Sequence, residues 1–117
     1  MATNMFKWLK EKATKAAANQ CRSSIALDVR RLVAISNQAE EHLNQTGGAN
    51  RSDVERVIAA QHRLLDDITL GLSNRLSLQD VESGIGEALE RETVGDGARM
   101  AVNHILNHVR SGLRQAV

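Results

Sequence analysis

The chain has 117 residues, of which 42% are hydrophobic and 25% charged, and its formal net charge is +1. This length suits one domain with a single core, and a charge of +1 is far from the strongly basic balance of most DNA-binding domains. The sequence contains no proline, and its only aromatic residues are Phe6 and Trp8. We therefore expect helices throughout, punctuated by glycine, around a core of aliphatic side chains.

The first twenty residues are predicted to form a basic amphipathic helix. All four lysines of the protein lie between positions 7 and 15, and residues 1–31 carry seven basic against two acidic side chains. At about 100° per residue, aliphatic and alanine side chains gather on one face of this segment and lysines on another. We interpret residues 1–20 as a detachable arm. Its candidate contact residues for a partner or a membrane are Met5, Phe6, Lys7, Trp8, Leu9, Lys10 and Lys15.

Three surfaces fit the pattern of this arm. Apolar residues opposite lysines, with tryptophan at the border, are typical of a helix lying in a membrane surface. Docking against the protein's own bundle or against a partner protein explains the same pattern.

A second apolar stripe begins at Cys21 and continues to Leu43 without an intervening glycine. The pattern does not decide whether residues 5–45 form one long helix or two helices broken near residues 19–24.

Glycine pairs and capping motifs predict the later elements. Gly47 and Gly48 predict a helix end and a hairpin turn. A helix should then start with a capping box of Ser52 and Glu55 and end near residue 76. A weaker cap at residues 77–80 opens a short helix, residues 94–97 break the chain, and a last amphipathic helix runs from residue 98 to 117. The sequence thus predicts a single all-α domain, an antiparallel bundle of four or five helices spanning residues 1–117.

Candidate catalytic and metal-binding groups do not converge in this pattern. His104 and His108 share one side of the last helix at i and i+4, but no histidine has a glutamate three residues before it, as di-metal bundles require. Neighbouring acids such as Glu40 and Glu41 project about 100° apart and cannot meet on one substrate. The lone Cys21 lies on an apolar stripe, where a thiol usually serves as packing. We therefore expect no metal, no cofactor and no enzymatic activity.

A resemblance to a known family covers residues 29–68. The stretch Val29-Arg30-Arg31-Leu32, followed by Asn37-Gln38, Leu43-Asn44 and Gly47-Gly48, resembles the core of the MobC-like plasmid mobilisation proteins. Those proteins assist a relaxase in opening DNA at a transfer origin. The resemblance implies a DNA-binding accessory role, with DNA contacts carried by Arg30, Arg31, Asn37 and Gln38.

The leading hypothesis is a non-catalytic interaction or adaptor protein of bacterial type that works through protein–protein contacts. Leu27, Leu70 and Trp8 fall off the main apolar stripes, which suggests that the chain forms a homo-oligomer. The first residues show no continuous apolar stretch, so we expect a cytoplasmic protein. The alternatives are a DNA-binding accessory protein of a mobilisation-type complex and a protein held at a membrane surface by its N-terminal helix.

Overall fold

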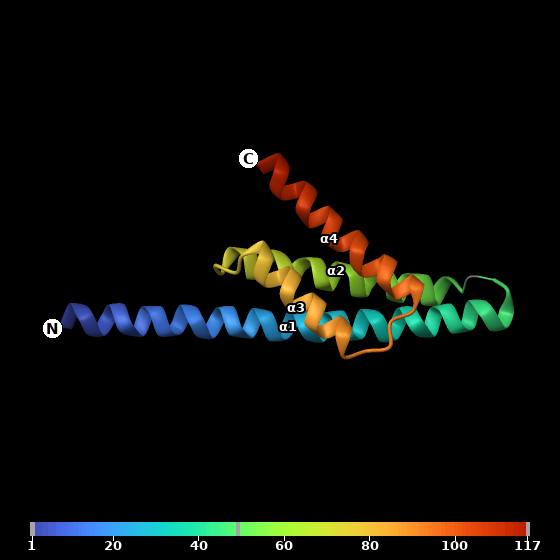
Figure 1. Cartoon of the computed structure of the whole chain (residues 1–117), viewed down its shortest axis with the longest axis horizontal. Helices are drawn as coiled ribbons and strands as arrows, with labels where there is room; N and C mark the ends of the chain where they lie inside the picture. Colours follow the sequence, from blue (N-terminus) through green and yellow to red (C-terminus); the bar gives the residue numbers. More distant parts are fainter. Residues whose placement is uncertain (1, 49, 117) are drawn as a thin grey trace.

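The computed structural model is a four-helix protein (Figure 1). It describes the backbone of residues 2–48 and 50–116 and the side chains of residues 5–48 and 50–113. The helices are α1 (Ala2–Thr46), α2 (Arg51–Ser73), α3 (Leu78–Glu90) and α4 (Asp96–Ala116). Within these ranges the structure contains no strand, and the predicted all-α bundle is confirmed.

α1 is one continuous helix of 45 residues, which answers the question that the sequence left open. No glycine or proline interrupts it, and four alanines between positions 13 and 18 favour helix where the two apolar stripes meet. At 1.5 Å per residue such a helix is about 67 Å long. It sets the long dimension of the molecule, whose extents are 68 × 29 × 23 Å.

The turn between α1 and α2 makes an antiparallel hairpin (Figure 1). Gly47 adopts a left-handed backbone conformation with φ of 73°, and its N–H donates to the carbonyl of Leu43 over 2.8 Å. This is the glycine helix end that the sequence predicted. Ala49, in the same predicted turn, lies outside the described residues.

The predicted capping box of Ser52 and Glu55 is wrong. Asn50 is the N-cap of α2, and its side-chain oxygen accepts from the backbone N–H of Ser52 over 2.9 Å. Asparagine caps a helix as well as serine does and comes two residues earlier, so the helix begins at Arg51. Glu55 instead forms an exposed ion pair with Arg51 at 3.1 Å.

α2 ends at Ser73, three residues before the predicted end, and α3 begins at the predicted cap. Arg75 takes a left-handed φ of 70°, which turns the chain and lets Leu76 enter the core. The hydroxyl of Ser77 accepts from the N–H of Asp80, whose carboxylate accepts from the N–H of Ser77. This capping box confirms the start of the short helix.

α4 begins at Asp96, two residues before the expected start, because the carbonyl of Gly95 already accepts from the N–H of Arg99 over 3.0 Å. α3 and α4 both pack on the α1–α2 hairpin (Figure 1). The last predicted residue of the final helix, Val117, lies outside the described residues.

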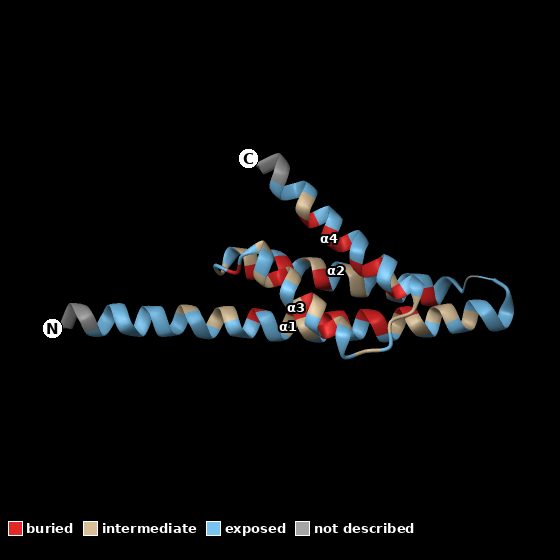
Figure 2. Cartoon of the chain, viewed as in Figure 1, coloured by how far each residue is buried: buried red, intermediate tan, exposed pale blue. Residues whose placement is uncertain are grey.

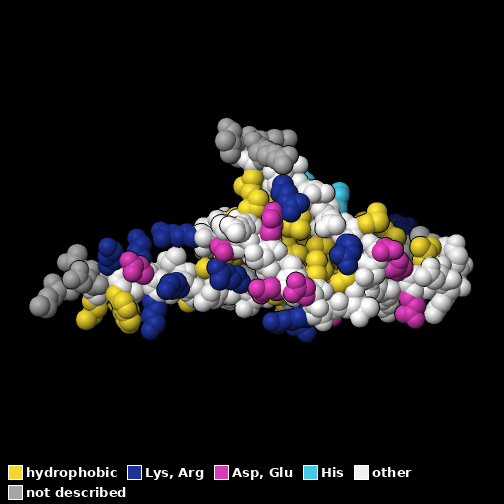
Figure 3. Space-filling model, viewed as in Figure 1, with side chains coloured by type: hydrophobic (Ala, Val, Ile, Leu, Met, Phe, Trp, Pro, Cys, Tyr) yellow, Lys and Arg dark blue, Asp and Glu magenta, His cyan; other side chains and the backbone are white. Residues whose placement is uncertain are grey.

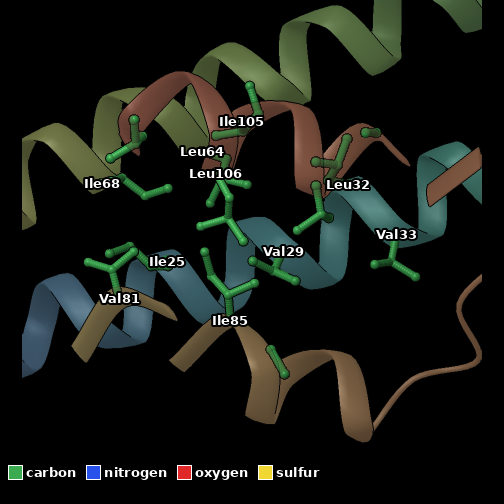
Figure 4. Close-up of a cluster of buried hydrophobic side chains, with 14 of the residues drawn as sticks. Ile25, Val29, Leu32, Val33, Leu64, Ile68, Val81, Ile85, Ile105 and Leu106 are labelled. Atoms are coloured by element: carbon green, nitrogen blue, oxygen red, sulfur yellow. The ribbon is translucent and has the colours of Figure 1, made fainter. Parts of the chain in front are cut away.

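The core is aliphatic, as predicted, and draws on all four helices (Figure 4). Full burial of such a side chain contributes about 1.5–3 kcal/mol. Its labelled members are Ile25, Val29, Leu32 and Val33 from α1, Leu64 and Ile68 from α2, Val81 and Ile85 from α3, and Ile105 and Leu106 from α4.

The core does not extend along the whole of the predicted stripes (Figure 2). Leu43, Val54 and Ile58 belong to those stripes but remain 44–46% exposed near the hairpin turn. Buried residues concentrate where α3 and α4 cross the hairpin. An apolar period therefore marked the correct face of each helix, but not how much of that face is covered.

Candidate interaction surface

The N-terminal part of α1 projects beyond the other helices (Figure 2). Near the end of α2, Gly71 packs against Cys21 and Ile25, so α2 accompanies α1 only as far as about residue 18. Residues 5–16 form the projecting segment, called the arm from here on. All its side chains are exposed except that of Thr14, which is half-buried.

The arm exposes four large hydrophobic side chains. Met5 is 66% exposed, Phe6 74%, Trp8 56% and Leu9 50%. These are among the predicted contact residues, and the structure keeps them away from the bundle. Docking of the arm on its own bundle, one of the three interpretations of the sequence, does not occur in this structure.

Basic side chains lie close to this apolar group (Figure 3). The arm carries Lys7, Lys10, Lys12 and Lys15 against one acid, Glu11. The ammonium of Lys12 lies 4.7 Å from the centre of the Trp8 ring, within the range of a cation–π contact. Among the ion pairs of the described side chains, none involves the arm. The arm therefore presents aromatic and aliphatic area together with a net positive charge.

The four residues of the predicted DNA contact do not form one free surface. Arg30 donates to the carboxylate of Glu92 over 3.1 Å and so ties α1 to the end of α3. Asn37 donates to the carbonyl of Thr93 over 2.7 Å and accepts from the N–H of Gly95 over 3.0 Å. Both contacts hold the connection between α3 and α4 on α1.

The other two residues lie beside a groove between α1 and α2. Gln38 accepts from Arg56 over 3.3 Å, and Arg31 is exposed. Arg31, Arg56 and Arg63 line this groove, whose volume is about 340 Å³. None of the three has a carboxylate within ion-pair distance among the described side chains.

The same groove contains a buried carboxyl group that the sequence did not reveal. Asp28 is 4% exposed, and its Oδ2 has no hydrogen-bond partner among the described residues. Desolvation by burial and, to a smaller extent, the adjacent carboxyl of Asp67 together raise the pKa of Asp28 to about 7, against the opposing effect of Arg63 and Arg31. In the sequence, the burial of Asp28 was indicated only by its position beside the apolar stripe of α1, directly after Leu27.

A second polar contact missed by the sequence joins the hairpin near its turn. The Nδ1 atom of His42 lies 2.7 Å from the Oδ2 atom of Asp53, which is 7% exposed. Asp53 is one of the first residues of α2, where a carboxylate interacts favourably with the helix dipole.

The candidate metal and thiol residues lie apart. His104 and His108 are exposed on α4, and the buried Cys21 of α1 belongs to the core cluster. The described residues contain no group of three potential metal ligands.

The length of α2 could have indicated from the sequence that the N-terminal part of α1 projects beyond the hairpin. A hairpin closed at residues 47–50 brings residue 73 beside about residue 24, since paired antiparallel helices advance equally. The first twenty residues therefore extend past α2, whatever their own apolar pattern is.

No described helix is both long enough and apolar enough to cross a membrane. Comparison with protein families, curated proteins and solved structures finds no match for this chain.

Proposed function

We propose that this chain is a non-catalytic interaction protein in which the bundle holds the arm and the arm binds the partner. The observation that carries this proposal is the exposure of Met5, Phe6, Trp8 and Leu9 on the part of α1 that no other helix covers. Aromatic side chains dominate the energetics of protein and membrane contacts, because each buries a large area at small cost in conformational entropy. The only two aromatic residues of the chain both lie in the arm.

The polar contacts of the bundle support a binding role over a catalytic one. The pair of His42 and Asp53 joins α1 to α2, and that of Arg30 and Glu92 joins α1 to the connection after α3. Arg110 donates to Glu82 over 2.9 Å and joins α4 to α3. These contacts fix the positions of the helices relative to one another, which suits a scaffold that presents a surface.

Photo-cross-linking in the native host tests this function. A photoreactive phenylalanine analogue is placed at Phe6 in the arm, and in a matched control at Met100, which is 72% exposed on α4. Adducts to a protein or to lipid are expected from position 6 and not from position 100. Equal adduct patterns from the two positions, or no adducts from position 6, would refute the role of the arm.

The proposal includes self-association through the bundle. Leu27 on α1 and Leu70 on α2 are 43% and 55% exposed, and each lies off the main stripe of its helix. Light scattering during size-exclusion chromatography at tens of micromolar should give a multiple of the 12.8 kDa chain mass. A strictly monomeric mass would remove self-association from the proposal and leave the arm unaffected.

A DNA-accessory role is the second candidate function. It is favoured by Arg31, Arg56 and Arg63, which line one groove and form no ion pair among the described side chains, and weakened by the contacts that already engage Arg30 and Asn37. Binding to double-stranded DNA should appear at low salt and weaken as salt rises, because phosphate contacts release counterions. The Arg31→Gln/Arg63→Gln variant should abolish it. No binding at low salt would reject this candidate.

A further inference from the structure

The arm has the arrangement of a helix that lies on an anionic lipid surface. At about 100° per residue, Met5, Phe6 and Leu9 occupy one face of α1 together with Ala13 and Ala16. An apolar face of this kind is suited to lie at the boundary between headgroups and acyl chains, where a helix keeps its backbone hydrogen bonds and loses only apolar hydration.

Two lysines lie at the edges of this apolar face. Lys10 follows one edge and Lys12 the other, while Lys15 and Lys7 lie farther round the helix. Lysines at the edges bury their methylene stems against apolar surface while their ammonium groups reach outward to phosphate. Trp8 lies on the same edge as Lys12, whose ammonium packs on its ring, and this combination suits the headgroup region.

The face of α1 that carries Leu9 stays exposed beyond the arm. Eighteen residues make five helical turns, so Leu27, Arg31 and Ala34 lie on the same face of α1 as Leu9, Ala13 and Ala16. All three are exposed, and Arg31 also lines the groove between α1 and α2. The face of α1 that would meet a lipid surface at the arm therefore carries a further exposed leucine and a further exposed cation.

We propose that the arm binds the surface of membranes containing anionic lipids, with Met5, Phe6 and Leu9 entering the interface and the lysines contacting phosphate headgroups. This inference rests on the proposed function and names the partner of the same surface. Charge complementarity favours an anionic lipid surface, since the arm carries four lysines and one glutamate in twelve residues.

Trp8 is the only tryptophan of the chain, so the fluorescence of the intact protein reports on the arm alone. Titration with vesicles of phosphatidylcholine and phosphatidylglycerol should shift its emission to shorter wavelength and saturate. Vesicles of phosphatidylcholine alone, or soluble glycerophosphate, should leave the emission unchanged. Raised salt should weaken the binding, because it screens the lysines. Absence of a shift with the anionic vesicles at low salt would overturn the proposal.

Matched variants separate specific insertion from general adhesion. Phe6→Gln/Leu9→Gln keeps the charge of the arm and should weaken vesicle co-sedimentation at least tenfold, with Met100→Gln as its control. Lys10→Gln/Lys15→Gln should weaken it by about fivefold for each lysine removed, with Arg99→Gln as its control. Equal binding by all four proteins would overturn the proposal.

The cross-linking experiment distinguishes the two levels of inference. Protein adducts from position 6 together with no vesicle binding would overturn the membrane proposal and leave the interaction function standing. Lipid adducts from position 6 together with arm-dependent vesicle binding would support both. No adducts from position 6 and no vesicle binding would refute both.

Discussion

The buried carboxyl of Asp28 makes the stability of this protein depend on pH in an unusual direction. In the unfolded chain Asp28 releases its proton near the ordinary pKa of 3.8, and in the folded protein burial raises that pKa to about 7. Between these values the folded state binds more protons than the unfolded state, so its stability falls as pH rises. The contribution is fully present below about pH 4 and is lost above pH 7.

The size of this effect follows from the two pKa values. From pH 5 to pH 7 the folded state must hold a proton that the unfolded chain has already released, over about two pH units at about 1.4 kcal/mol each. Asp28→Asn replaces the carboxyl by a neutral amide of the same shape. We expect the wild-type chain to lose roughly 3 kcal/mol between pH 5 and pH 8 that Asp28→Asn retains.

Urea unfolding followed by circular dichroism at the two pH values measures this difference. Other ionisable groups, including Asp80, whose pKa is lowered by its hydrogen bonds to Ser77, are present in both proteins and cancel in the comparison. Asp66→Asn is the matched control, because Asp66 lies next to the partner carboxyl Asp67 and is exposed. An equal change of stability with pH in wild type and Asp28→Asn would refute the assignment, and so would an Asp28→Asn variant that is the less stable protein at pH 8.

Three further variants test the packing around two glycines and the hydrogen bonds of Asn37. A methyl group at Gly71 would lie 2.9 Å from the Cδ1 atom of the buried Leu76, so Gly71→Ala should cost about 1–2 kcal/mol by thermal unfolding, even though alanine favours helix. Gly84→Ala places its methyl group in open space within α3 and should stabilise by up to about 1 kcal/mol; the opposite order of the two variants would contradict this packing. Asn37→Ala removes both hydrogen bonds to the connection between α3 and α4 and should cost about 1–3 kcal/mol in urea unfolding, whereas an unchanged midpoint would show that those bonds hold nothing in solution.

Local signals in the sequence predicted the helices well where one residue dominates the choice. Gly47 ends α1 because a left-handed φ is easiest for glycine, and Ser77 with Asp80 opens α3 because their side chains satisfy two free backbone donors. Both Asn50 and Ser52 are residues that commonly cap the N-terminus of a helix, and in the structure Asn50 is the N-cap of α2. The spacing of the two residues in the sequence did not show which of them caps the helix.

Tertiary geometry was harder to predict, because the same apolar period describes covered and uncovered faces. Leu9 and Ile25 both lie on apolar stripes of α1, but Ile25 is 2% exposed while Leu9 remains half exposed. The two stripes lie on opposite faces of α1, and the bundle packs only on the face of Ile25; Leu27, which lies on the face of Leu9, stays 43% exposed within the bundle. The burial of Asp28 likewise depends on how α2 packs against α1, which brings Asp67 and Arg63 beside it.

The continuity of α1 affects how the arm contributes to binding. An isolated peptide of a dozen residues forms helix poorly in water, because its first turn must be nucleated at a large entropic cost. Here the buried stretch from Cys21 onward supplies that nucleus, and the alanines at positions 16–18 propagate it outward. A ligand that binds Phe6 and Leu9 therefore meets a preformed helix. Many peptides that fold on binding lose affinity because their chain loses conformational entropy at that step, and the arm avoids this loss because the bundle already holds it in helical form.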